Sequence, residues 1–161
     1  MGNADLVLSI ESKGYFLGLH AIFKPHKIPY SAVASEDTSA CLMDIHAFSD
    51  LIHKNGEFAA GMLKRINDDT KRGYEGMATL GLKQLHGRLS GLLLCLSIRI
   101  YKSRKFLTSL SRKDMAEITI KSNESLSRVL KDMKDDSILK VSGNQFEILN
   151  IESLRKISKV G

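Results

Sequence analysis

The most regular pattern of apolar and polar positions lies in residues 111–135. The stretch that begins at Ser122 has apolar residues at helical spacing, and the Ser122 hydroxyl can cap its first turn. Ser111 and Asp114 resemble a capping box, with Asp in place of the usual Glu or Gln, and predict a shorter helix just before it. Two short helices around a tight turn are typical of a helix-turn-helix. The turn is expected at residues 120–122, where Ile120 takes a place that often holds Gly. The expected apolar residues are Met115, Ile118 and Ile120 in the first helix and Leu126, Val129, Leu130 and Met133 in the second.

Two apolar runs follow this motif, at residues 138–141 and 146–149. The residues between them are turn formers, Ser142, Gly143, Asn144 and Gln145, so the pattern predicts a β-hairpin. A hairpin directly after a helix-turn-helix forms a wing. Asn150 is then expected to cap a last helix over residues 151–158.

A long helix is predicted for residues 57–82, because a narrow apolar stripe recurs there at spacings of three and four. Such a stripe either joins two copies of the helix or packs on its own domain. We favour a dimer seam, since the other faces are polar. Gly81 lies where the pattern changes phase, which predicts a hinge at 78–83 before a new helix over 83–101. The seam consists of Phe58, Met62, Ile66, Thr70, Gly73, Met77 and Leu80.

The N-terminal part reads as β structure followed by one helix. Residues 6–10, 30–34 and 39–43 are expected to be strands, and a helix is expected from Asp44. A few strands cannot close a sandwich or a barrel. Either they pair with something outside this chain, or the chain begins partway into a domain. Residues 102–108 are expected to be a polar linker.

Composition narrows the class of protein. The chain has 161 residues, 43% of them apolar, and no run of 18 apolar residues that could cross a membrane. The N-terminus lacks the basic and apolar regions of a signal peptide. Two cysteines are no disulfide framework, so the cytoplasm is the expected location.

Charge is distributed unevenly along the chain. Residues 1–98 carry 10 basic and 10 acidic residues, whereas residues 99–161 carry 14 basic and 8 acidic ones. All the excess positive charge therefore accompanies the helix-turn-helix, as in a nucleic-acid-binding domain. A solvated basic surface would give the same count, and charge alone does not separate the two.

No enzyme is predicted. The sequence contains no nucleophile–base pair, no phosphate-cradling glycine loop, and no HExxH or CxxC motif. The five histidines show no metal-ligand spacing with cysteines or acidic residues, so no catalytic or metal site is assigned.

Residues 110–148 resemble the winged helix-turn-helix of the Crp/Fnr family of bacterial transcription regulators. The resemblance implies an α+β, mostly α fold, with a partial β-roll remnant of a cyclic-nucleotide-binding-like sensor domain at 1–56. A dimerisation helix and hinge at 57–82 and a winged helix-turn-helix at 83–161 would follow. The resemblance is carried by residues 111–116, Ser122, Glu124, 127–130 and 143–146. It continues upstream through residues 87–89, 18–22 and 29–32.

The same resemblance implies a function. It suggests a homodimeric, sequence-specific DNA-binding regulator, controlled by an effector through the dimer helix and hinge, with RNA polymerase as a further partner. The alternative is a winged-helix module for protein interaction or assembly, without specific DNA binding.

Specific DNA contacts also follow from the resemblance. Glu124, Ser127 and Arg128 resemble the Fnr branch, which reads TTGA-type half-sites. Arg128 would donate to a guanine, Glu124 would accept from a cytosine amino group, Ser127 would make a short contact nearby, and Asn123 would touch base or phosphate. Glu124 and Arg128 can also form an ion pair on a solvated helix, and both roles can hold. Phosphate contacts are expected from Ser122, Lys121, Lys131, Lys140, Ser111 and Arg112.

The effector is not expected to be cyclic AMP. Family members that bind it have a Glu after the glycine of the phosphate cassette and an Arg before Ser-Ala, where this chain has Leu19 and Tyr30. Cys41 lies at a place similar to a cluster ligand of Fnr. An iron–sulfur cluster needs about four cysteines, so a further N-terminal region would have to supply the others. No cofactor is therefore expected in this chain, Cys41 is predicted to be a small buried residue, and Cys95 to be core.

Overall fold

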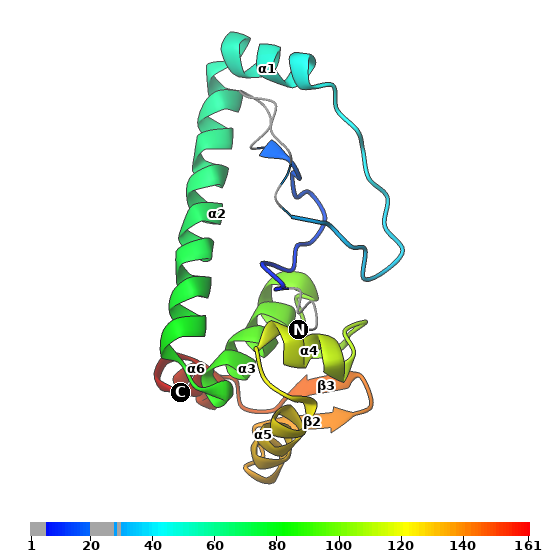
Figure 1. Cartoon of the computed structure of the whole chain (residues 1–161), viewed down its shortest axis with the longest axis vertical. Coiled ribbons are helices and arrows are strands. Elements are labelled where there is room, and N and C mark those ends of the chain that lie inside the picture. Colours follow the sequence, from blue (N-terminus) through cyan, green and yellow to red (C-terminus); the bar gives the residue numbers. More distant parts are fainter. Residues whose placement is uncertain (1–5, 20–27, 29) are drawn as a thin grey trace, which may run out of the picture. The chain divides into compact units, whose positions relative to one another are not determined.

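The computed structural model describes residues 6–19, 28 and 30–161. It divides into two compact units: an N-terminal unit, Lys13–Tyr74, and a C-terminal unit, which joins Met1–Ser12 to Glu75–Gly161. Helix α2 contributes residues to both. The elements, drawn in Figure 1, are α1 (Ile45–Lys54), α2 (Gly56–Leu82), α3 (Leu85–Leu94), the π-helical turn η2 (Cys95–Ile100), β1 (Lys105–Leu107), α4 (Arg112–Ile118), α5 (Asn123–Asp135), β2 (Leu139–Ser142), β3 (Gln145–Ile148) and α6 (Ile151–Val160).

The N-terminal unit is built around helix α1. The helix expected from Asp44 is confirmed, and Asp44 is its N-cap, because its carboxylate accepts from the amides of Ala47 at 3.0 Å and His46 at 2.9 Å. The bond from the Ala47 amide is the main cause that lowers the pKa of Asp44. Phe48 is the buried residue of α1, and its ring meets those of Phe16 and Phe58 edge-on.

The three strands expected in the N-terminal part are not formed. Residues 6–10, 30–34 and 39–43 have no strand structure. A strand needs a neighbour for its amides and carbonyls, and no extended segment in the described part of the chain pairs with these three. Several of their apolar side chains are accordingly open to solvent, with Val33 89% and Leu42 100% exposed, whereas Ile10 is half-buried against the core of the C-terminal unit. Of the segments that carry the family resemblance, residues 20–22 and Pro29 lie outside the described residues.

The long helix is confirmed as α2. The Asn55 side chain caps its start by accepting from the Phe58 amide at 3.0 Å. The expected hinge at 78–83 is displaced, because Gly81 lies inside α2 and the chain leaves the helix at Lys83 and Gln84, where Gln84 is extended. A single glycine costs only about 1 kcal/mol in a helix, which the surrounding helical hydrogen bonds outweigh.

The C-terminal unit has one hydrophobic core between its helices and a three-stranded antiparallel sheet of order β1-β3-β2. The rings of Phe106 and Phe146 stack with centroids 5.8 Å apart inside it. Full burial of one such side chain contributes about 1.5–3 kcal/mol, so this core holds α4, α5 and the wing together. The residues it buries almost completely include Leu89, Leu93, Leu96, Met115, Leu126, Met133, Leu139, Phe146 and Leu154.

Strand β1 lies where a polar linker was expected. It pairs with β3, and Phe106 stands opposite Phe146. Sequence pattern missed it because Phe106 is its one inward-facing side chain, between the exposed Lys105 and Leu107. The hairpin of β2 and β3 confirms the predicted wing. Asn150 caps α6 as expected, since its side chain accepts from the Ser153 amide at 3.0 Å.

Candidate nucleic-acid interface

Helices α4 and α5 form the predicted helix-turn-helix. Both bonds of the capping box at Ser111 are present: its hydroxyl accepts from the Asp114 amide at 3.1 Å, and the Asp114 carboxylate accepts from the Ser111 amide at 2.7 Å. The Ser122 hydroxyl accepts from the Ser125 amide at 3.2 Å and caps α5. The start of each helix is therefore set by local residues, as the sequence predicted.

The turn between these helices contains Ile120 in a left-handed conformation, with φ at 52°. Ile120 was expected both as an apolar residue of the first helix and as the first residue of the turn; α4 ends at Ile118, so Ile120 belongs to the turn, where it is 48% exposed. A β-branched residue rarely adopts this conformation, because its Cβ crowds the next carbonyl oxygen. The turn thus stores strain at the entrance to α5.

The outer face of α5 is polar and exposed. The helix buries Leu126, Val129, Leu130 and Met133, which turns Asn123, Glu124, Ser127 and Arg128 outward. Arg128 donates to Glu124 at 2.5 Å, and the two side chains are 71% and 77% exposed. The Ser127 hydroxyl donates to the Asn123 carbonyl at 2.8 Å. An exposed ion pair adds little stability, so packing does not account for these residues.

A groove of about 300 Å³ runs beside this face, between α5, α4 and the wing. It contains three cations, of which Lys134 was not predicted from the sequence. Lys134 lies three residues after Lys131, so helical spacing alone could have indicated that both reach the same side. The groove is lined by Arg112, Ser127, Leu130, Lys131, Lys134, Val141 and Gly143.

Arg112, an expected phosphate contact, has partners inside the protein. Its guanidinium donates to the Gly143 carbonyl at 2.8 Å and lies 4.9 Å from the centre of the Phe146 ring. Burial lowers the pKa of Arg112. The Asn144 carbonyl also accepts from the Thr108 amide at 3.1 Å, so the tip of the wing is held on two sides.

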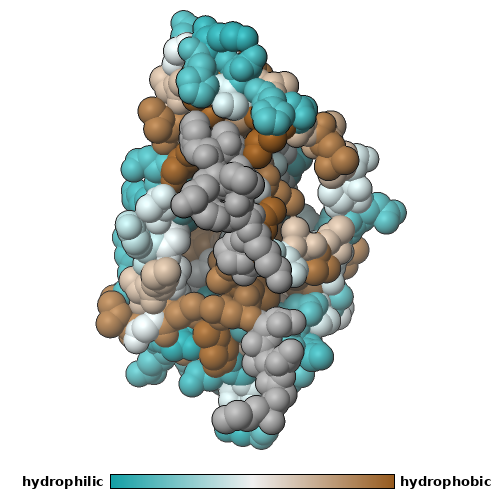
Figure 2. Space-filling model, turned by 45° about the horizontal axis from the view of Figure 1, so that its top comes forward, coloured by the Kyte–Doolittle hydropathy of each residue, from teal (hydrophilic) through white to brown (hydrophobic). Residues whose placement is uncertain are grey.

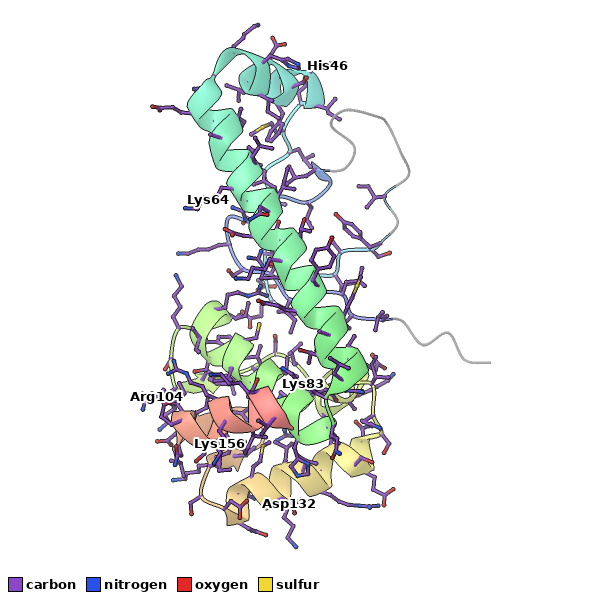
Figure 3. The ribbon with its side chains drawn as sticks, turned by 90° about the vertical axis from the view of Figure 1, so that its left-hand side faces the viewer. His46, Lys64, Lys83, Arg104, Asp132 and Lys156 are labelled. Atoms are coloured by element: carbon purple, nitrogen blue, oxygen red, sulfur yellow. The ribbon has the colours of Figure 1, made fainter. Side chains whose placement is uncertain are left out.

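The lysines expected to contact phosphate, Lys121, Lys131 and Lys140, are all exposed. Lys140 and Lys105 stand on either side of Glu147 in the register of the sheet, so a carboxylate offsets part of their positive charge. Figure 3 shows side chains on all sides of this unit, including Asp132 on α5 and Lys156 on α6. Among the residues that the structure describes, no acidic residue lines the groove, whose cations are Arg112, Lys131 and Lys134.

The residues of the proposed dimer seam on α2 fall into two groups, one packed within the chain and one exposed. Met62 is buried by its own chain and Phe58 packs on Phe48, so the expectation that these two face a second copy is corrected. Phe48 of α1 packs on Phe58, and Arg65 of α2 lies over the rings of Tyr15 and Phe16, so other parts of the N-terminal unit lie against this stretch of α2. Further along, Ile66 is 43% and Met77 is 71% exposed, and hydrophobic side chains reach the surface in several places (Figure 2). The exposed remainder of the seam is Ile66, Thr70, Gly73 and Met77, with Leu80 half-buried, and Leu63 and Tyr74 are further exposed residues of α2.

The residues considered for an effector are only partly described. Cys41 is exposed, so its predicted burial was wrong; the expected strand 39–43 that contains it is not formed. Cys95 is half-buried. The Tyr30 hydroxyl accepts from the Gly18 amide at 3.3 Å, while residues 20–22 and Pro29 lie outside the described part. Within that part, no three His, Cys, Asp or Glu residues gather as metal ligands, and no helix has the length and apolarity to cross a membrane.

Comparison with known proteins bears on the C-terminal unit above all. Residues 87–157 match the Crp-like helix-turn-helix domain. The chain is 26% identical over 136 residues to the fumarate and nitrate reduction regulatory protein of Vibrio cholerae, a match that covers 82% of this chain and 54% of the relative. The chain thus spans about half the length of the curated relative it matches.

Solved structures show the same fold. FixK2 from Bradyrhizobium japonicum superposes with a TM-score of 0.66 at 19% identity, over 73% of this chain and 60% of that one. A variant of CooA from Carboxydothermus hydrogenoformans gives a TM-score of 0.59 at 21% identity, over 71% and 55%. A putative regulator of the Crp/Fnr family from Eubacterium rectale gives 0.53 at 15% identity, over 71% and 52%. These likenesses confirm the fold expected from the Crp/Fnr resemblance.

Proposed function

The chain carries a Crp-like helix-turn-helix domain, and from this we propose that the protein is a sequence-specific DNA-binding transcription regulator that acts as a homodimer. The observation that carries the proposal is the outer face of α5, where an exposed polar set has no role in the core. A recognition helix presents such residues to base edges in the major groove. We propose no enzymatic activity.

The proposed base contacts are those of Glu124, Ser127, Arg128 and Asn123. In a TTGA-type half-site, Arg128 donates to a guanine and Glu124 accepts from a cytosine amino group. The ion pair between them supports this assignment, because it holds the Arg128 guanidinium over the exposed face before DNA arrives.

Phosphate contacts position the helix without reading sequence. We assign them to Lys121, Lys131 and Lys140, to the helix-capping Ser111 and Ser122, and now also to Lys134 in the groove. Arg112 is removed from this set, because its guanidinium is already bound to the wing.

Homodimerisation rests on the exposed stripe of α2 around Ile66, Thr70, Gly73 and Met77. Two copies related by a two-fold axis would present two α5 helices to half-sites about 34 Å apart. An effector would act through α2 and the break at Lys83 and Gln84. Cyclic AMP is not proposed as that effector, and an iron–sulfur cluster would need cysteines beyond Cys41 and Cys95. RNA polymerase is the proposed further partner.

The test of base reading is the substitution Arg128→Ala. It should weaken binding to a duplex with two TTGA half-sites by about 1–3 kcal/mol and relax specificity at one base pair. The control is Arg155→Ala, since Arg155 on α6 also forms an exposed ion pair, at 2.9 Å from Glu152. Fluorescence anisotropy against single-base variants of the site measures both. If Arg128→Ala binds the duplex as tightly as the parent, α5 does not read bases through Arg128, and the proposed role of this helix is wrong.

The second candidate is a protein-interaction module. The exposed Leu107 and Leu149 of the C-terminal unit favour it, because apolar side chains at the surface can serve a protein partner. A salt titration with random duplex separates the two. A DNA-binding protein loses affinity steeply as salt rises. If the chain binds no duplex even at low salt, the interaction module takes precedence.

A further inference from the structure

Arg88 on α3 donates to three backbone carbonyls that come from three places in the C-terminal unit. Its Nη2 donates to Leu80 at 2.7 Å, its Nε to Lys83 at 2.8 Å, and its Nη1 to Thr119 at 3.1 Å. Leu80 and Lys83 lie on either side of the end of α2, and Thr119 is the C-cap residue that follows α4. One half-buried guanidinium therefore joins the end of α2 to the turn of the helix-turn-helix.

This contact meets a need that both helices have. The last carbonyls of a helix have no partner within it, and its C-terminal end carries partial negative charge. The last turns of α2 and α4, both in the described part of the chain, contain no basic residue of their own. Arg88 supplies the missing cation to both ends at once, and its planar fork suits several acceptors in fixed directions.

The positions of the three acceptors give the contact a consequence for α5. Lys83 is followed by Gln84, where the chain changes direction between α2 and α3; Figure 3 shows Lys83 at this place. Thr119 is followed by the strained Ile120 and then by Ser122, the cap of α5. A rotation of the last turn of α2 must therefore either move the turn before α5 or break a hydrogen bond of Arg88.

We propose that Arg88 is a positioning residue that couples the end of α2 to the entrance of the recognition helix. Removing its fork uncouples the last turn of α2 from the turn at Thr119 and Ile120. The consequence for DNA rests on the function proposed above: without the coupling, the two recognition helices of a dimer lose their fixed spacing. The geometric part of the inference does not depend on DNA binding.

The geometric test measures the distance from α2 to α5 within one chain. Spin labels replace Glu75 on α2 and Asp135 on α5, both exposed, in a background without Cys41 and Cys95. Labelled chains are diluted with unlabelled chains, so that pulsed electron paramagnetic resonance reads only intrachain distances. Arg88→Ala should broaden the distance distribution, and Arg88→Lys should restore part of it. Arg155→Ala, which removes an ion pair with Glu152 on the same helix, should match the parent.

Thermal unfolding by circular dichroism shows which variants are folded, and Arg88→Gln replaces Arg88→Ala if the latter is not. An unchanged distance distribution in the folded Arg88 variant overturns the coupling. So does an equal broadening in Arg155→Ala.

The DNA test compares two duplexes, one with two TTGA half-sites about 34 Å apart and one with a single half-site. Arg88→Ala should lose roughly tenfold in affinity for the first, or ~1.4 kcal/mol, and keep its affinity for the second. An equal loss on both overturns the positioning role. If the parent binds neither duplex while the distance result holds, the proposed function fails and the coupling stands.

Discussion

At the scale of single residues, the exposed face of α5 and the turn before it depart from what stability alone would select. Glu124 and Arg128 pair in solvent, where an ion pair contributes ~0–1 kcal/mol. Ile120 holds a left-handed conformation that glycine or asparagine would adopt at lower cost. Such departures gather where residues serve something other than the core.

The strain at Ile120 can be measured by substitution with glycine. The control is Leu149→Gly, because Leu149 is 49% exposed against 48% for Ile120 and is not among the residues with positive φ in the described part. Both changes remove similar apolar contact and add similar freedom to the unfolded chain. Ile120→Gly should therefore leave the protein about 1–2 kcal/mol more stable than Leu149→Gly does. Urea unfolding gives the two values, and equal values would show an unstrained turn.

At the scale of elements, two kinds of hydrogen bond hold the winged helix-turn-helix together: local caps at the starts of helices, and bonds from arginines to carbonyls far away in the sequence. The capping box at Ser111 and the cap at Ser122 start α4 and α5. Arg112 of α4 donates to the Gly143 carbonyl in the wing. Arg88 donates both to Leu80 of α2 and to Thr119 at the end of α4. Caps set where a helix begins, whereas the hydrogen bonds of Arg112 and Arg88 set how neighbouring elements are oriented.

Because Arg112 is hydrogen-bonded to the Gly143 carbonyl, its removal should lower the stability of the protein and should not remove a contact with DNA phosphate. Arg112→Ala should lower the free energy of unfolding by about 1 kcal/mol, near the low end for a bond from a charged donor, because the side chain is half exposed. The salt dependence of duplex binding should stay unchanged, whereas loss of a phosphate contact would reduce the slope by about one.

Chemical denaturation and a salt titration measure the two effects of Arg112→Ala. Lys113→Ala is the matched control, since Lys113 is the exposed neighbour of Arg112 and its side chain lies 3.8 Å from Glu117. A reduced salt slope at full stability would return Arg112 to the phosphate contacts.

At the scale of the whole molecule, the proposed function needs two copies of the chain. The exposed stripe of α2 is the part of the expected seam that remains available, because Phe58 packs on Phe48 and Met62 is buried. Since Met77 is 71% exposed in a single chain, a charge there should spare the fold and disturb only a contact with another copy.

Met77→Glu should therefore shift the protein from dimer to monomer in analytical ultracentrifugation at unchanged helix content. Lys71→Glu, on the polar face of the same helix, should leave the dimer intact. A parent that sediments as a monomer, or a Met77→Glu variant as dimeric as the parent, would contradict the seam.

The sequence by itself determined the elements whose signals are local. The caps at Asp44, Ser111, Ser122 and Asn150, the apolar spacing of α2 and α5, and the turn residues of the wing all act within a few positions. The same local pattern turned Arg128 and its neighbours to the surface, because burying one face of a helix exposes the opposite one.

Only the tertiary structure decided the features that depend on a residue or strand far away in the sequence. Residues 105–107 became a strand because β3 lies beside them, while residues 30–34 and 39–43 found no partner among the described residues. The division of the α2 stripe likewise depends on where α1 folds. The roles of Arg88 and Arg112 were hidden for the same reason: each binds a carbonyl 31 residues away, and spacing along the chain carries no sign of such a contact.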